Sequence, residues 1–159
     1  MPSLMPGMAG AKEVYGIAVV GDDLSLAVPP KAMEKYGMAD GDPVLIAAVR
    51  REAGAFSVMH KHRAEQSVFG KIVRGIKQPD TVFRFGGKAY MLTTIRDGRI
   101  RLVPDMAGAC RVVTKDRLLA IKGSNTGVSY AHAAAWEQRL KDRGFIEALQ
   151  NMKKLEIFQ

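Results

Sequence analysis

Histidine and cysteine are the side chains of this chain best suited to bind a metal or to act in catalysis, and they are few. The histidines are His60, His62 and His132, and the single cysteine is Cys110. His60 and His62 alternate at the end of a predicted strand, so they point to opposite faces. No further ligands follow at the spacing of a zinc site, so we expect surface histidines and no metal. We expect Cys110 to be buried rather than reactive.

Two polar segments contain part of a catalytic or nucleotide-binding motif, but each lacks the other residues that the motif needs. Ser124-Asn125-Thr126 contains hydroxyl groups, but the sequence offers no general base to activate them. Gly86-Gly87-Lys88 lacks the remainder of a phosphate-binding loop, and its two glycines favour a hairpin turn. The sequence therefore predicts neither an enzyme nor a cofactor.

Positive charge is concentrated in the second half of the chain. The 159 residues carry a formal net charge of +8, which favours an acidic partner such as DNA. Residues 81–159 hold 14 Lys and Arg against 7 Asp and Glu, whereas residues 1–80 hold 10 against 9. The chain has one cysteine, which suits a reducing compartment. It has no long apolar run, and its start is unlike a signal peptide. We therefore expect a cytoplasmic protein without membrane contact.

The segment that must organise these side chains is residues 26–46, which reads as strand, helix, turn and strand. Pro29 and Pro30 end the first strand and suit the first turn of a helix. Gly37 suits the left-handed residue at a helix C-terminus. Asp40-Gly41-Asp42 predicts a turn, and the apolar run that follows it predicts a buried strand.

By these residues the chain resembles the swapped-hairpin family of AbrB, SpoVT and MazE. Val28-Pro29 match the Ile-Pro pair of the family's hallmark. Tyr36-Gly37-Met38 match its Leu-Gly-Ile, and Gly41-Asp42 match its Gly-Asp, with no gap between them. The resemblance implies a small β-barrel built from interlocked hairpins, and a DNA-binding function.

The second half looks like a degenerate copy of the first, displaced by 74 residues. Pro30 then aligns with Pro104, and Asp42 with Asp116. Arg111 and Lys115 stand where the first copy has glycines. One copy of about 45 residues is too short to bury a sufficient core alone, so we expect both copies to share one.

The resemblance also implies a DNA-contacting surface. In that family a Gly-Arg pair begins the second strand, and its arginine belongs to this surface. Gly98-Arg99 match the pair, whereas Leu24-Ser25 in the first repeat do not. Arg99 and Arg101 share one face of their strand because side chains alternate. The predicted DNA-binding residues, mainly from the second repeat, are Arg96, Arg99, Arg101, Lys88, Lys31 and Lys35.

These observations predict a mainly β fold with short helices. Two tandem repeats would form a swapped-hairpin AbrB-like β-barrel, followed by C-terminal helices. The predicted segments are a flexible tail (1–12), a first repeat (13–78), a second repeat (79–131) and a C-terminal helical segment (132–159).

The first functional prediction is a sequence-specific or semi-specific DNA-binding transcriptional regulator that acts as a homodimer on double-stranded DNA. One alternative is an antitoxin-like or scaffolding module that binds a protein partner. The helical C-terminal segment of mixed charge disfavours it, since MazE-like antitoxins end in a disordered acidic tail. Another is a barrel that has lost DNA binding and holds a small ligand or only assembles. The acidic Asp22-Asp23 turn favours this alternative, because it would repel phosphates.

Overall fold

A large open sheet and a short two-stranded ribbon form the framework of the protein. The computed structural model describes residues 13–48, 54–123 and 126–159, and the predicted flexible tail lies outside them. In chain order, the strands of the large sheet are β1 (Val14–Val19), β3 (Pro43–Ala48), β4 (Gly54–His60), β5 (Phe83–Phe85), β6 (Lys88–Thr94), β8 (Arg117–Lys122), β9 (Gly127–His132) and β10 (Ile157–Phe158). The ribbon pairs β2 (Ser25–Ala27) with β7 (Arg99–Arg101).

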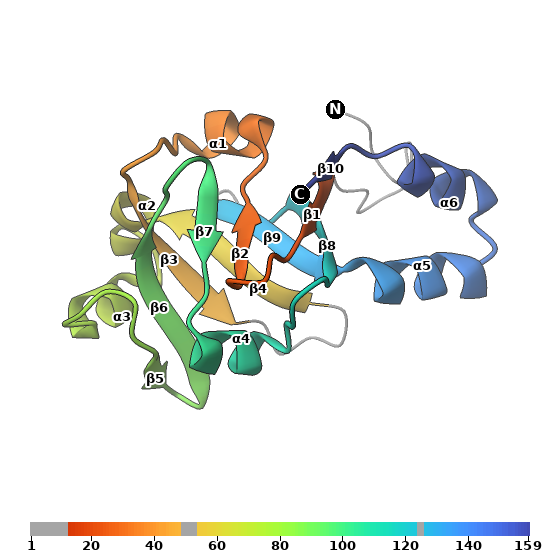
Figure 1. The fold of residues 1–159 in the computed structure, drawn as a ribbon. Helices are drawn as coiled ribbons and strands as arrows, with labels where there is room; N and C mark the ends of the chain where they lie inside the picture. The colour runs from red at the N-terminus through yellow and green to blue at the C-terminus, as the bar shows by residue number, and fades with distance from the viewer. Residues whose placement is uncertain (1–12, 49–53, 124–125) are drawn as a thin grey trace.

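Six helices surround these strands in the described part of the chain, and Figure 1 shows them around the sheet. They are α1 (Pro30–Tyr36), α2 (Lys61–Glu65), α3 (Gly70–Gly75), α4 (Pro104–Cys110), α5 (Ala133–Asp142) and α6 (Ile146–Lys153).

The predicted β-barrel is wrong, because the large sheet is not closed. Its strands follow the order β10-β1-β8-β9-β4-β3-β6-β5, so β10 and β5 form two separate edges. The sheet is also mixed, because β10 runs parallel to β1 while the other neighbours are antiparallel. With about 36% strand and 31% helix, the protein is mixed α/β rather than mainly β.

Two features explain this correction. Residues 61–76 were predicted as part of the first repeat of the barrel, but they form α2 and α3 and cover one end of the sheet. The prediction also placed residues 157–158 in a helical tail, but they form β10 and pair with the outer side of β1. β1 therefore gains an extra neighbour at the edge where a barrel would have to close.

The two halves of the chain exchange strands within the large sheet. β1 of the first half pairs with β8 of the second, and β6 of the second half pairs with β3 of the first. β4 and β9 join the two hairpins at the centre. The largest core cluster accordingly combines buried side chains from both halves, including Val44 and Ile46 from β3 and Leu118 and Ala120 from β8.

The opposite face of the same strands is covered by helices. Leu45 and Ala47 alternate with the core residues of β3 and pack under α2 and α3. Leu119 and Ile121 of β8 likewise pack under α5 and α6. The ribbon, α1 and α4 therefore lie on one side of the sheet, and the other four helices lie on the other side (Figure 1).

Helices α1 and α4 have the same bounds after displacement by 74 residues, as do strands β2 and β7. Each helix has a proline in its first turn and ends at a left-handed residue, which is Gly37 (φ 64°) in α1 and Arg111 (φ 58°) in α4. After each helix a carboxylate accepts a hydrogen bond of 2.9 Å from a main-chain N–H. Asp42 accepts from Ala39, and Asp116 accepts from Val113.

Candidate anion-binding surfaces

The β2–β7 ribbon pairs corresponding strands of the two repeats with each other. Leu26 faces Ile100 across the ribbon, and these two residues are themselves 74 positions apart. Both are buried under the ribbon, so the side chains on either side of Ile100, those of Arg99 and Arg101, belong to its outer face. Both arginines lie on β7 on either side of buried Ile100, which is the arrangement that the sequence prediction assumed.

Arg99 uses its guanidinium group for contacts within the protein. Nε donates to Ser25 Oγ at 3.1 Å, and Nη2 donates to the Ser25 carbonyl oxygen at 3.1 Å. Nη1 donates to the main-chain oxygen of Gln159 at 2.6 Å. The half-buried side chain of Arg99 therefore joins β2 to the C-terminal segment, and its geometry suits a positioning role.

Arg101 and Arg96 are exposed beside the same strand. Arg101 Nε donates to the Asp23 carbonyl oxygen at 3.1 Å. The main chain of Arg96 bonds to that of Arg99 across the β6–β7 turn, and its side chain is exposed. These two cations flank the ribbon at its two ends.

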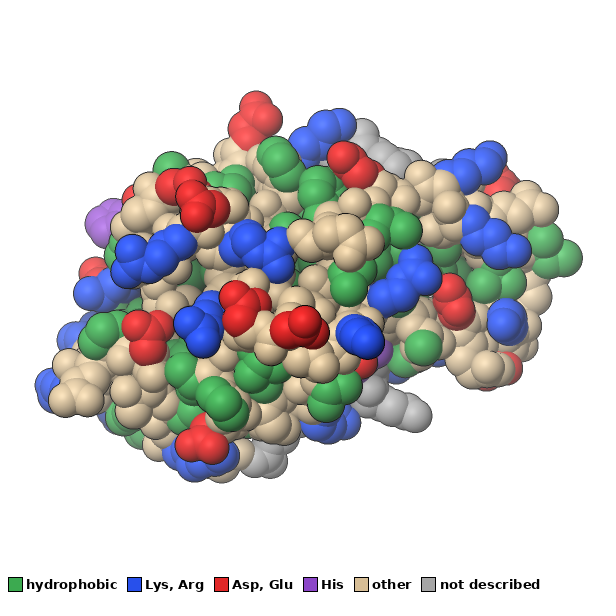
Figure 2. Space-filling model, in the orientation of Figure 1, with side chains coloured by type: hydrophobic (Ala, Val, Ile, Leu, Met, Phe, Trp, Pro, Cys, Tyr) green, Lys and Arg blue, Asp and Glu red, His purple; other side chains and the backbone are tan. Residues whose placement is uncertain are grey.

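Carboxylates lie close to these arginines. The Ser25 hydroxyl and main-chain N–H both donate to Asp23 and lower the pKa of its carboxyl, with a smaller contribution from the charge of Arg101. Asp40 accepts a hydrogen bond of 2.7 Å from the Gly98 N–H, in the turn next to Arg96. Figure 2 shows Lys and Arg side chains interspersed with Asp and Glu on this face. The ribbon face is thus mixed in charge, not uniformly basic.

The other predicted DNA-binding residues lie apart from the ribbon arginines. Lys35 forms an ion pair of 3.9 Å with Glu13. Exposed Lys31, on α1, lines a pocket with residues 154–156 and Phe158 of the C-terminal segment. Lys88 begins β6, whereas Arg96 follows the other end of that strand. The structure therefore brings together Arg99 and Arg101 and leaves Lys88 at a second site.

This second site is a pocket of about 410 Å³ that Lys88 lines together with Arg84 and Arg111. The sequence prediction missed the last two. Arg84 lies on β5, just before the Gly86-Gly87 turn, and no motif in the sequence gave its side chain a role. Arg111 was noted as a departure from the repeat, because it replaces the glycine of the first copy. The replacement of Gly37 by Arg111 in the second copy is the one sequence feature that could have indicated a cationic site here.

Positive charge in the second half is little compensated by ion pairs. The ion pairs found between described residues are Lys35–Glu13, His60–Asp42 and Lys61–Glu65. Within the ranges 81–123 and 126–159, no Lys or Arg takes part in one of these pairs. Several of these cations, including Arg84, Lys88, Arg96 and Arg101, are exposed.

The histidines and the cysteine show no arrangement typical of catalysis. His60 Nδ1 accepts a hydrogen bond of 3.0 Å from the His62 N–H, and His60 Nε2 lies 3.3 Å from Asp42. His132 ends β9. Cys110 is fully buried, and burial raises the pKa of its thiol to about 12. The described residues contain no group of three His, Cys, Asp or Glu side chains placed to hold a metal ion.

No family model matches the chain, and no similar curated protein or solved structure was found. In the described ranges, none of the helices has the length and apolar character needed to cross a membrane.

Proposed function

We propose that the protein binds double-stranded DNA and acts as a transcriptional regulator. The observation that supports this proposal is the surplus of positive charge in the second half, where residues 81–159 hold 14 Lys and Arg against 7 Asp and Glu. Its cations lie outside the ion pairs found between described residues. A duplex attracts such cations because each phosphate contact releases condensed counterions.

In this proposal the DNA contacts come from Arg96 and Arg101, at the two ends of the ribbon. Both side chains are exposed and belong to a rigid two-stranded element above the shared core. Lys31 can add a contact from α1. Arg99 is not included, because its three donor groups are already bonded to Ser25 and Gln159.

The nearby carboxylates restrict how DNA can lie on this surface. Asp22 and Asp23 belong to the turn before β2 and are exposed, so they repel phosphate on the side of the ribbon that they border. DNA would then be held in one orientation, with β7 and the turn before it, which carry Arg101 and Arg96, nearer to the DNA backbone.

The test is the salt dependence of binding to a fluorescently labelled random-sequence duplex, measured by anisotropy. We expect the wild-type affinity to fall steeply as salt rises, and the double variant Arg96→Ala, Arg101→Ala to bind about tenfold more weakly with a shallower slope. The matched control is Lys141→Ala, Arg143→Ala, which removes the same charge from exposed positions at the end of α5.

Three results would decide against the proposal. Absence of binding at low salt would reject DNA as the partner. Equal losses in both double variants would show a response to net charge alone. An unchanged affinity in the Arg96, Arg101 variant would reject the ribbon as the contact surface.

A further inference from the structure

A second site lies on the pocket formed by the end of β3, the β5–β6 hairpin and the end of α4. Among the described residues, three cations line it, Arg84, Lys88 and Arg111, and none of those in the lining is acidic. The other described lining residues are Ala48, Gly87, Ala89 and Ala109. We propose that this pocket binds the phosphate group of a small phosphorylated molecule.

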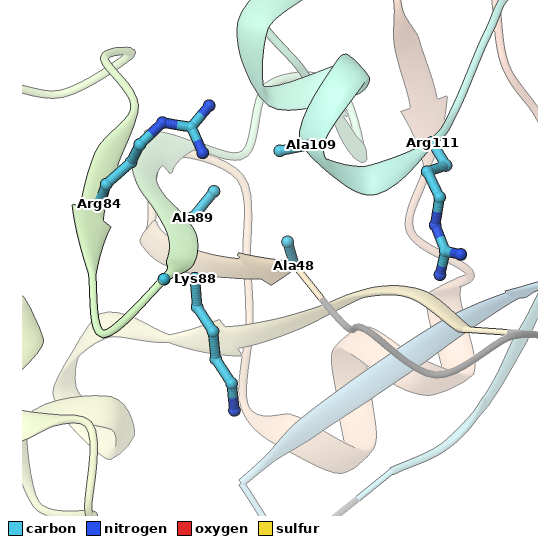
Figure 3. Close-up of a pocket in the computed structure, with 7 residues that line it drawn as sticks. Ala48, Arg84, Lys88, Ala89, Ala109 and Arg111 are labelled. Atoms are coloured by element: carbon cyan, nitrogen blue, oxygen red, sulfur yellow. The ribbon is translucent and has the colours of Figure 1, made fainter.

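The arrangement of side chains in Figure 3 fits such a ligand. The three alanines lie in the middle of the view, Arg84 stands on one side of them, and Arg111 stands on the other. Lys88 extends from beside Ala89. The alanine side chains are too small to fill the pocket, and the longer cationic side chains lie around it. A volume of about 410 Å³ is in the range of pockets for small molecules.

The internal repeat shows how this space arises. The counterpart of Ala89 in the first half is Tyr15, and the counterpart of Cys110 is Tyr36. Tyr15 and Tyr36 pack edge to face with ring centroids 6.4 Å apart, and both are buried. The second half therefore has small side chains where the first half has two packed aromatic rings.

The same comparison shows how the charge arises. Lys88 stands at the position of Val14, a core residue, and Arg111 stands at the position of Gly37. Arg84 comes from β5, an edge strand that the structure describes only in the second half. The cations have thus changed place between the two copies, because Ala109 and Ala48 of the pocket stand at the positions of Lys35 and Lys122. Alanines therefore lie in the middle of the pocket, and Arg84, Lys88 and Arg111 lie around them.

The backbone at Arg111 adds an independent observation. Arg111 ends α4 with φ 58°, in the left-handed region, where the equivalent Gly37 has φ 64°. This conformation is unfavourable for a side chain with a Cβ and is natural for glycine. Strained backbone often occurs at ligand sites. Of the described non-glycine residues with positive φ, which are Leu24, Asp80, Asp97, Arg111 and Lys115, Arg111 is the one that lines the pocket.

Phosphate is the ligand chemistry that fits these side chains best. Guanidinium groups bond phosphate oxygens in pairs, and a lysine adds a compact positive charge. The inference does not depend on the proposed DNA binding, since Arg96 and Arg101 do not line the pocket. A backbone phosphate of DNA has the same chemistry, and the experiment below separates the two sources.

The experiment is a calorimetric titration of the full chain with pyrophosphate, without DNA. We expect saturable binding to wild type and about tenfold weaker binding to both Arg84→Ala and Arg111→Gly, which is the loss expected for a hydrogen bond to a charged group. Arg111→Gly removes the unfavourable backbone strain, so we expect it to retain the fold, which circular dichroism checks.

The matched control is Lys115→Gly. Lys115 also has a left-handed backbone (φ 71°) in the place of a first-half glycine, Gly41, but it does not line the pocket. We expect its affinity for pyrophosphate to equal that of wild type. An equal loss in Lys115→Gly and Arg111→Gly would overturn the pocket as the site.

Three further results would overturn the proposal. No saturable heat with pyrophosphate would reject phosphate binding. Tighter binding of citrate than of pyrophosphate would assign the pocket to polycarboxylates. Displacement of bound pyrophosphate by duplex DNA would make the pocket part of a DNA surface. The DNA experiment with the Arg96, Arg101 variant is separate, so either proposal can fail while the other stands.

Discussion

Arg99 donates a hydrogen bond of 2.6 Å from Nη1 to the main-chain oxygen of Gln159, 60 positions further along the chain. The same guanidinium holds Ser25 through two hydrogen bonds. β10, next to Gln159, pairs with β1 on the edge of the large sheet. Arg99 thus connects the ribbon to the segment that covers this edge.

This contact predicts that alanine substitution of Arg99 and of Arg101 will change the free energy of unfolding by different amounts. Arg99→Ala removes three donors from a half-buried site, so we expect the free energy of unfolding in urea to fall by about 1–3 kcal/mol. Arg101→Ala acts on an exposed side chain, so its effect should stay within about 0.5 kcal/mol.

Hydrogen exchange locates the effect within the structure. The Ile17 N–H donates to the Glu156 carbonyl oxygen at 2.9 Å and reports on the docking of the C-terminal segment. We expect faster exchange at Ile17 in Arg99→Ala and not in Arg101→Ala. An Arg99 variant with wild-type stability and wild-type exchange at Ile17 would contradict the positioning role.

Much of the local structure was predictable from the sequence because its signals are short-range. Prolines, glycines and apolar runs placed α1, the strands after it and their copies 74 residues later. Within the predicted C-terminal helical segment, Gly144 has φ 70° and separates α5 from α6. Each of these signals acts through the backbone of one or two residues.

The closure of the sheet was not predictable in this way. The two edges are β10 and β5, and β10 pairs residues 157–158 with β1, a contact over about 140 positions. A two-residue strand has no alternating pattern of its own. The pocket was missed for a related reason, because its three cations come from β5, β6 and the end of α4 and only the fold brings them together.

Gly16 is the residue on β1 that admits the C-terminal segment. It has φ 143°, and a Cβ there would lie 2.6 Å from Cε2 of Phe158 and 2.9 Å from the Glu156 carbonyl oxygen. We expect Gly16→Ala to lower the free energy of unfolding by about 1–3 kcal/mol, through this overlap and the unfavourable backbone. Thermal and urea unfolding measure the loss.

The matched control is Gly108→Ala in α4. A Cβ at Gly108 meets no atom within 4 Å, and the residue lies inside a helix. Alanine favours the helix over glycine by about 0.5–1 kcal/mol, so this variant should be more stable than wild type. Similar destabilisation of both variants would show that the close approach of Phe158 to Gly16 is not the cause.

The reaction of the Cys110 thiol with a disulfide reagent measures how often the shared core opens. It is the chain's single cysteine, it is fully buried in the cluster that combines both halves, and its thiol has a pKa raised to about 12 by burial. A raised pKa keeps the thiol protonated below that pH, and the thiolate is the reactive form. We therefore expect very slow reaction with a disulfide reagent from pH 7 to pH 9.

The reaction rate should follow opening of the core rather than the concentration of thiolate in the native state. Urea should accelerate it strongly at constant pH, because unfolding exposes the thiol and returns its pKa to the ordinary value. Gly16→Ala should accelerate it in proportion to its loss of stability if opening is global, whereas Gly108→Ala should slow it. Rapid stoichiometric labelling of the native protein at pH 7 would show instead that the core around α4 opens locally, without unfolding of the sheet.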